Sequence, residues 1–459
     1  MEEHQENAPD NIEPIQDTLT HNLPVEIVAQ VFIHFVDAFQ PFRWGEDYER
    51  RESDFYWAPT LVLSAVCRNW RSIAVVTPEL WTSPNIEMYY DGERDTVIEV
   101  LGLWLDRSRD LPLHISFIGN DDWVFDYSYW EPVFERAQAS SERWESLCLD
   151  INRNAWQFFL KEFTCPPCLR RIRLITPEVE EEERQVHDIA DFLLSSSSGR
   201  LEELRLENLS WYEVSVDWQN LLAVEAVSWN VDDFGWLLGH APRLKKCRLL
   251  DNDSRGRHSP LAHSHLEDLE LQDTTLSNII RWFTFPSLRR LVFKPGRTRW
   301  SPRDRLSQMN HLRSFFIRSQ CLLVELEIQV PFKTTANLVD ILAHLPSLER
   351  LTLDFDRNSR DHSVLWPSNE SFAEHLKFFT LSKLLPQLKV FKILGELTFS
   401  WSALLPFLER PPQGNVTSML KICVYVQFWL YFSSQQESED YIDRDVVFQL
   451  KDLERKWEG

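Results

Sequence analysis

The stretches LEDLEL (266–271) and LRRLVF (288–293) decide the fold of this chain. Each places apolar residues at its first, fourth and sixth positions, with charged residues between them. The phrase occurs eleven times: at 144–149, 169–174, 201–206, 224–229, 244–249, 266–271, 288–293, 323–328, 348–353, 388–393 and 420–425. Recurrence on this scale predicts an array of one repeated unit, not a series of unrelated segments.

Prolines indicate what lies between the phrases. Five phrases have a proline two residues before their first apolar position: Pro167, Pro242, Pro286, Pro346 and Pro386. Proline ends a helix and favours an extended segment after it. The run 337–345 has the spacing of an amphipathic helix, and 95–105 followed by 113–117 predicts a first helix–strand unit. Each unit is therefore expected to hold one helix and one strand.

The phrase resembles the strand motif of leucine-rich repeats. That resemblance implies an irregular α/β solenoid over residues 91–432, with a parallel sheet along its inner surface. Successive phrases begin 20 to 40 residues apart, which leaves room for helices of unequal length.

Residues between the apolar positions of a strand point to its opposite face. Stacking the phrases predicts two rows on the inner face of the array. The first row is Lys246, Asp268, Arg290, Glu325 and Arg350, and the second is Arg173, Arg205, Ser228, Arg248, Glu270, Val292, Glu327 and Thr352. Opposite charges alternate along the first row, so we expect a ladder of exposed ion pairs, each worth about 0–1 kcal/mol. Such a ladder either orders the stacking or takes part in substrate recognition.

If the charges of the inner face neutralise one another, we expect target recognition at the ends of the array or in its longer connections. The longest connections are 354–386 and 296–320. Trp300 and Trp366 lie in them and are the candidate substrate-binding residues. The alternative for each tryptophan is an aromatic anchor in the core.

The N-terminal part of the chain has a different pattern. In LPVEIVAQVF (23–32) and the residues after it, Pro24 suits a first helical position. Ile27, Val31 and Phe35 form one apolar stripe of the predicted helix, and Val28 with Phe32 forms a second. A helix this widely apolar is either an ordinary core helix or one that packs on its own module and on a partner.

A second segment, LSAVCRNWRSIAVVTPELW (63–81), completes the pattern. Leu63, Val66, Trp70, Ile73 and Ala74 recur at helical spacing, and Thr77-Pro78 ends the predicted helix. The two segments, in this order, resemble the F-box of fungal F-box proteins over roughly the first fifth of the chain. The insertion 37–59 between them is longer than the usual linker of that family and rich in aromatic residues, which leaves the position of the second helix open.

The resemblance implies a non-catalytic receptor: the substrate-recognition subunit of an SCF-type cullin-RING ubiquitin ligase. The module would bind a Skp-type adaptor and, through it, a cullin, while the array binds a target protein. The residues that would form or support the adaptor-facing surface are Leu23, Pro24, Glu26, Ile27, Val28, Phe32, Val66, Cys67, Arg68, Trp70 and Arg71. The alternative is an F-box-like interaction scaffold that never recruits a ligase.

Composition sets the remaining limits. A chain of 459 residues predicts more than one domain: an acidic leader over 1–20, a helical module over 21–90, the array over 91–432 and an acidic tail over 433–459. In the tail, Val446, Leu450, Leu453 and Trp457 fit a short amphipathic helix that either closes the array or docks on another protein. The net charge of −23 argues against nucleic-acid and anionic-membrane partners.

The sequence carries no pattern for catalysis. It lacks a glycine-rich phosphate loop, a GxSxG elbow and an HExxH pair, so we expect neither an enzyme nor a cofactor. Cys165 and Cys168 have a metal-like spacing but no second pair, which favours a structural turn over zinc or a redox dithiol. Seven scattered cysteines, with no secretory leader or membrane span in the pattern, predict a reduced cytoplasmic or nuclear protein.

Overall fold

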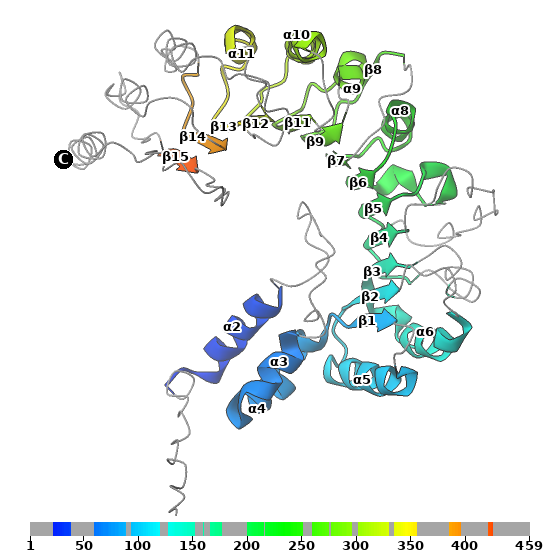
Figure 1. Cartoon of the computed structure of the whole chain (residues 1–459). Helices are drawn as coiled ribbons and strands as arrows, with labels where there is room; N and C mark the ends of the chain where they lie inside the picture. Colours follow the sequence, from blue (N-terminus) through cyan, green and yellow to red (C-terminus); the bar gives the residue numbers. More distant parts are fainter. Residues whose placement is uncertain are drawn as a thin grey trace, which may run out of the picture. The chain divides into compact units, whose positions relative to one another are not determined.

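The structure is a computed structural model of the whole chain (Figure 1). It describes residues 22–37, 59–88, 93–119, 127–151, 159, 166–176, 200–214, 216–250, 259–274, 277–295, 302–329, 335–355, 385–395 and 421–425. Two compact units make up the chain, residues 1–168 and residues 169–459. The acidic leader, most of the 37–59 insertion and the acidic tail lie outside the described residues, as do Trp300, Trp366 and Cys165.

The first unit begins with a helical module. Its helices are α2 (Val25–Asp37), α3 (Pro59–Val66) and α4 (Arg68–Val76), followed by the 3₁₀ turn η1 (Pro78–Trp81). The prediction of one helix across 63–76 is wrong, because the chain breaks at Cys67. This residue is extended, with φ −157° and ψ 171°, and its Sγ accepts a hydrogen bond from the Trp70 backbone N–H at the start of α4. Cys67 thus serves as the N-cap of the third helix.

Parallel strands and further helices follow the module in the first unit. The strands are β1 (Asn85–Met88), β2 (Leu113–Gly119) and β3 (Trp144–Asp150), which pair in parallel in that order. Helix α5 (Arg94–Arg107) packs against α6 (Glu131–Gln138). The helix and strand expected at 95–105 and 113–117 are therefore confirmed as α5 and β2. Strand β1 was not expected from the sequence.

The second unit is built on one parallel sheet. Its strands follow in chain order: β4 (Arg171–Ile175), β5 (Glu203–Glu207), β6 (Ala223–Val227), β7 (Lys246–Leu250), β9 (Asp268–Thr274), β11 (Arg290–Pro295), β12 (Glu325–Gln329), β13 (Arg350–Phe355), β14 (Val390–Gly395) and β15 (Lys421–Tyr425). A separate pair joins β8 (Leu261–Ala262) to β10 (Phe283–Thr284). Every repeat phrase of the sequence contributes a strand, so the leucine-rich-repeat-like α/β solenoid is confirmed.

Helices connect several of these strands: α8 (Val231–His240), α9 (Ser277–Trp282), α10 (Pro302–Ser319) and α11 (Thr335–Leu342). Figure 1 shows all four on the same side of the strands of the second unit. Two layers of apolar side chains fill the space between these helices and the strands. Leu204, Val224, Cys247, Leu269 and Leu291 are aligned by the strand register in one layer, and Leu206, Ala226, Leu249, Leu271 and Phe293 are aligned in the other. Burial of these layers stabilises the stacking.

The register of β6 corrects one repeat. Val224 was placed at the first apolar position of its phrase, but it pairs with Leu204 and Cys247 at the fourth. The phrase therefore runs from Leu221 through Val224 to Ala226, three residues earlier than expected. Ser228, predicted in the second row, follows the strand with φ 66°, and Glu225 takes its place.

A buried histidine links three segments of the second unit. His263 follows β8, its Nε2 lies 3.0 Å from the Ala241 carbonyl oxygen at the end of α8, and its backbone N–H donates to Thr284 of β10. Its Nδ1 is buried without a hydrogen-bond partner. Burial lowers the pKa of His263 below its usual 6.5 and outweighs the hydrogen bond to the Ala241 carbonyl, which raises the pKa.

This environment predicts a pH dependence of stability. Between the lowered pKa and 6.5 the unfolded chain binds a proton at His263 that the native chain does not, so the free energy of unfolding falls as the pH drops below about 6.5. Urea denaturation of wild type and His263→Gln at pH 7.5 and pH 5.5 measures the effect. We expect a smaller loss in the variant, since the titrations of other groups are common to both. An equal loss in the two proteins would contradict this assignment.

Candidate protein-interaction surfaces

The core of the helical module is centred on η1. Trp81 is buried and donates its indole N–H to the Ala74 carbonyl of α4, at 2.8 Å. The buried Thr60 hydroxyl of α3 donates to the Leu80 carbonyl at 2.7 Å. The Pro78-Glu79-Leu80-Trp81 segment therefore ties the second and third helices together, and Trp104 of α5 packs edge-on against Trp81.

Helix α2 has two apolar stripes with different environments. Val28, Phe32 and Val36 are buried in the module core, where the Phe32 ring lies 4.8 Å from the Trp70 ring. Ile27, Val31 and Phe35, the other stripe, are exposed on the surface of the module. Both stripes were predicted, and the structure assigns one to the core and leaves the other exposed to solvent.

The turn between α3 and α4 holds further predicted residues. Val66 is exposed at the end of α3, together with Arg68 and Arg71. The Arg71 guanidinium Nε donates to the Ser64 carbonyl at 2.8 Å, which satisfies one of the carbonyls left open at the end of a helix. Trp70 is partly exposed and packs on Phe32. Arg71 and Trp70 therefore hold the turn in place.

The predicted adaptor-facing residues divide by burial. Exposed are Leu23, Pro24, Glu26, Ile27, Val66, Arg68 and Arg71, while Cys67 and Trp70 are partly exposed. Val28 and Phe32 are buried and support the surface from within; they do not line it. The surface also includes Val25, Leu61 and Val62, exposed apolar residues at the start of α2 and in α3 that the sequence did not single out. Their positions on the same helices as the predicted residues could have indicated that they belong to this surface.

On the second unit, the first predicted row is confirmed. Lys246, Asp268, Arg290, Glu325 and Arg350 are aligned in register across β7, β9, β11, β12 and β13. The Arg290 guanidinium lies 2.9 Å from Asp268 and 3.5 Å from Glu325, and Arg350 lies 2.7 Å from Glu325. Opposite charges on adjacent strands thus pair as expected.

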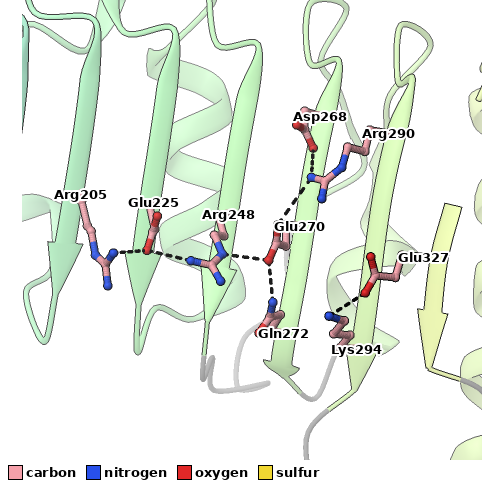
Figure 2. Close-up of polar contacts among 9 residues, drawn as sticks. All are labelled: Arg205, Glu225, Arg248, Asp268, Glu270, Gln272, Arg290, Lys294 and Glu327. Carbon is pink, nitrogen blue, oxygen red and sulfur yellow. Dashed lines mark hydrogen bonds and ion pairs between the residues drawn. The ribbon is translucent and has the colours of Figure 1, made fainter. Parts of the chain in front are cut away.

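The second row forms a connected ladder once Glu225 replaces Ser228. Figure 2 shows its side chains on the side of the sheet opposite the helices. Glu225 accepts from Arg205 at 2.9 Å and from Arg248 at 3.3 Å. Arg248 also donates to Glu270 at 2.9 Å, and Gln272 bonds the same carboxylate. Each charge between Arg205 and Glu270 therefore contacts opposite charges on both sides.

This ladder is more buried than the sequence predicted. Arg248 is 2% exposed and Glu225 1% exposed, so the expectation of exposed pairs is wrong here. A long side chain that reaches sideways to the next strand, about 4.8 Å away, is shielded by its neighbours. Burial raises the pKa of Glu225 against the pull of Arg205 and Arg248, and burial together with Arg173 lowers the pKa of Arg205.

Among the described residues, no group of His, Cys, Asp and Glu side chains could hold a metal ion. None of the described helices is long and apolar enough to cross a bilayer. Cys168 is exposed with a free thiol, but Cys165 lies outside the described residues, so the choice between a turn and a metal site at this pair stays a prediction.

Comparisons with known proteins add little to this picture. No family model and no curated protein matches the chain. The solved structures include the crystal structure of a TLR13–ssRNA13 complex, which is 13% identical, with a TM-score of 0.33 over 64% of this chain and 44% of that one. The chain thus matches less than half of that protein's length. The leucine-rich-repeat-like architecture rests on the strand order and register themselves.

The matched pair Phe32 and Phe35 tests the two stripes of α2. Phe32 is 2% exposed and Phe35 41% exposed on the same helix. We expect Phe32→Ala to lower the free energy of unfolding by about 3–5 kcal/mol through lost burial and a cavity. For Phe35→Ala we expect a change within about 1 kcal/mol. Urea denaturation of the full chain, with hydrogen exchange of the α2 amides, measures both, and equal losses would contradict the assignment.

Glu225 provides a second test, on the ladder. Glu225→Gln leaves two buried guanidinium groups without their shared carboxylate, and we expect a loss of about 3–5 kcal/mol. Glu349→Gln is the matched control, because the Glu349–Lys389 pair at 2.9 Å is partly exposed and should contribute about 0–1 kcal/mol. Denaturant unfolding compares the two variants. A Glu225→Gln loss no larger than that of the control would show that the ladder is not a buried network.

Proposed function

We propose that this protein is a non-catalytic receptor that docks its helical module onto a Skp-type adaptor of an SCF-type cullin-RING ligase. The observation that carries the proposal is the exposed stripe of Ile27, Val31 and Phe35 on α2. Large apolar side chains gathered on one helix face are typical of a surface that another protein covers. The kind of partner is inferred from the segments 23–32 and 63–81, which together resemble the F-box.

The packing of the helical module supports the proposal. Phe32, Trp70 and Trp81 hold α2, α3 and α4 as one packed core, so the exposed stripe is presented on a rigid base. Docking a preformed helix face needs little ordering of the chain, and less of the binding free energy is lost to entropy. Leu23 and Pro24 lie just before α2 and are exposed as well, which extends the surface at its N-terminal end.

In the same proposal the repeat array holds a target protein. A long stacked sheet provides an extended binding surface. The charges of the ladder from Arg205 to Glu270 neutralise one another, so the middle of this face does not attract a target by charge alone. Ubiquitin transfer would then follow from holding target and conjugating enzyme close together, since proximity alone supplies a large rate gain. No side chain of this chain is assigned a catalytic role.

Co-purification of the full chain with a Skp-type adaptor and a cullin tests the proposal. Ile27→Glu/Val31→Glu places two charges in the exposed stripe, and we expect at least about tenfold less adaptor recovered, equivalent to about 1.4 kcal/mol. The matched control is Ile317→Glu/Leu322→Glu, which makes the same change at two exposed apolar residues of the second unit.

The outcomes separate the two candidate functions. Adaptor and cullin recovered with wild type and the control, but not with the α2 variant, agree with the proposed receptor. Wild-type protein that recovers no adaptor contradicts it and leaves the interaction scaffold. Adaptor recovered without cullin also favours the scaffold, and equal recovery with the α2 variant would show that docking uses another surface.

A further inference from the structure

A column of aromatic rings lies on the second unit, away from the charge ladder. Trp211 of η5 (Trp211–Glu213) stacks on Trp236 of α8, with ring centroids 3.8 Å apart and planes at 13°. Trp236 stacks in turn on His240 at 4.0 Å, and the buried Trp218 meets Trp236 edge-on at 5.2 Å. Trp218 anchors the column, while Trp211 and Trp236 are only partly buried and His240 is exposed.

Tyr212 stands at the outer end of this column. Its side chain is 65% exposed, and its ring is nearly perpendicular to that of Trp211, at 87° with centroids 5.6 Å apart. Two perpendicular rings form an open corner whose π-electron faces attract a cation. An aromatic ring so exposed is not needed to fill the core, so the corner calls for an explanation other than packing.

Three aspartates lie on the segments that carry the rings of the column. The Trp211 indole donates a hydrogen bond to Asp233 in the first turn of α8, and the exposed Asp232 precedes it. Asp217 caps η6 (Trp218–Asn220), where it accepts from Gln219 and Asn220. No Lys or Arg of the described residues forms an ion pair with these three aspartates. A carboxylate on the indole N–H also pushes electron density toward the ring, which favours a cation further. The local charge is therefore complementary to a positively charged ligand.

The first unit contains a related ring pair that holds a cation, although its tryptophan, Trp130, is buried. Tyr129 and Trp130 are adjacent in sequence and perpendicular, at 88° with centroids 5.7 Å apart. The Arg94 guanidinium lies over the Tyr129 ring, 4.7 Å from its centroid. Among the described residues no Lys or Arg lies over Trp211 or Tyr212. An exposed tyrosine perpendicular to a neighbouring tryptophan thus binds an arginine in the first unit, and Tyr212 is an exposed tyrosine of this kind.

We propose that Trp211, Tyr212 and Asp232 bind an arginine side chain from a basic segment of a partner protein. A planar guanidinium can stack on one ring and still donate hydrogen bonds to a carboxylate, which a lysine ammonium does less well. The carboxylates repel phosphate groups, so a nucleic acid does not fit this surface. The inference concerns the second unit alone and holds whether or not the helical module binds an adaptor.

Titration of a fluorescein-labelled tetra-arginine peptide with the full-length protein, at about 0.15 M salt to screen distant charges, tests the proposal by fluorescence anisotropy. We expect Tyr212→Ala to weaken binding about two- to fivefold, from the loss of a cation–π contact at an exposed site. Tyr212→Phe keeps the ring and should bind as wild type does. Asp232→Asn should also weaken binding, and a tetra-citrulline peptide, which is neutral, should bind far less tightly.

Tyr129→Ala is the matched control. It removes an exposed tyrosine that is also perpendicular to a tryptophan, but Arg94 already lies over the ring of this tyrosine. It should leave peptide binding unchanged. Equal affinity of wild type and a folded Tyr212→Ala protein, checked by circular dichroism, would overturn the proposal and assign the binding to general attraction by an acidic protein. Equal binding of the arginine and citrulline peptides would overturn it too.

Discussion

Helix α2 carries two apolar stripes, and the core of the helical module buries only one of them. Val28, Phe32 and Val36 occupy the space beside Trp70, Ile73 and Trp81, while Ile27, Val31 and Phe35 stay exposed. An exposed apolar stripe gains free energy when another surface removes it from water, by about 25 cal/mol per Å². The same packing that makes the module stable therefore fixes the surface that a partner would use.

The two sides of the repeat array are stabilised by different interactions. Its parallel strands bury two layers of apolar side chains on the helix side, while the opposite side is organised by charge. Desolvation opposes ion pairs as buried as Arg248 with Glu225 and Glu270, and only contacts with two opposite charges offset it. A one-residue shift of a strand would turn its charged residues into the apolar layers, so the ladder and the layers require the same register. The ladder orders the array and offers little net charge to a target.

The sequence was a good guide to elements and a weaker one to their environments. The repeat phrases predicted the strands of the second unit because apolar positions one, four and six are dictated by the buried layers. Ser228 was misplaced because Val224 satisfies the phrase at either its first or its fourth position, and only pairing with Leu204 and Cys247 decides between them. Which stripe of α2 is buried depends on Trp70 and Trp81, more than thirty residues away. The Trp211–Trp236 stack escaped notice because it joins residues from different elements and follows no repeat.

The most direct test of the central claim is hydrogen–deuterium exchange of the full chain with and without a purified Skp-type adaptor. We expect slower exchange in peptides that cover 23–37 and 59–66, with no change in the strands that carry the ladder, β5 to β9. Unchanged exchange in both helices at saturating adaptor, or protection confined to the second unit, would contradict it.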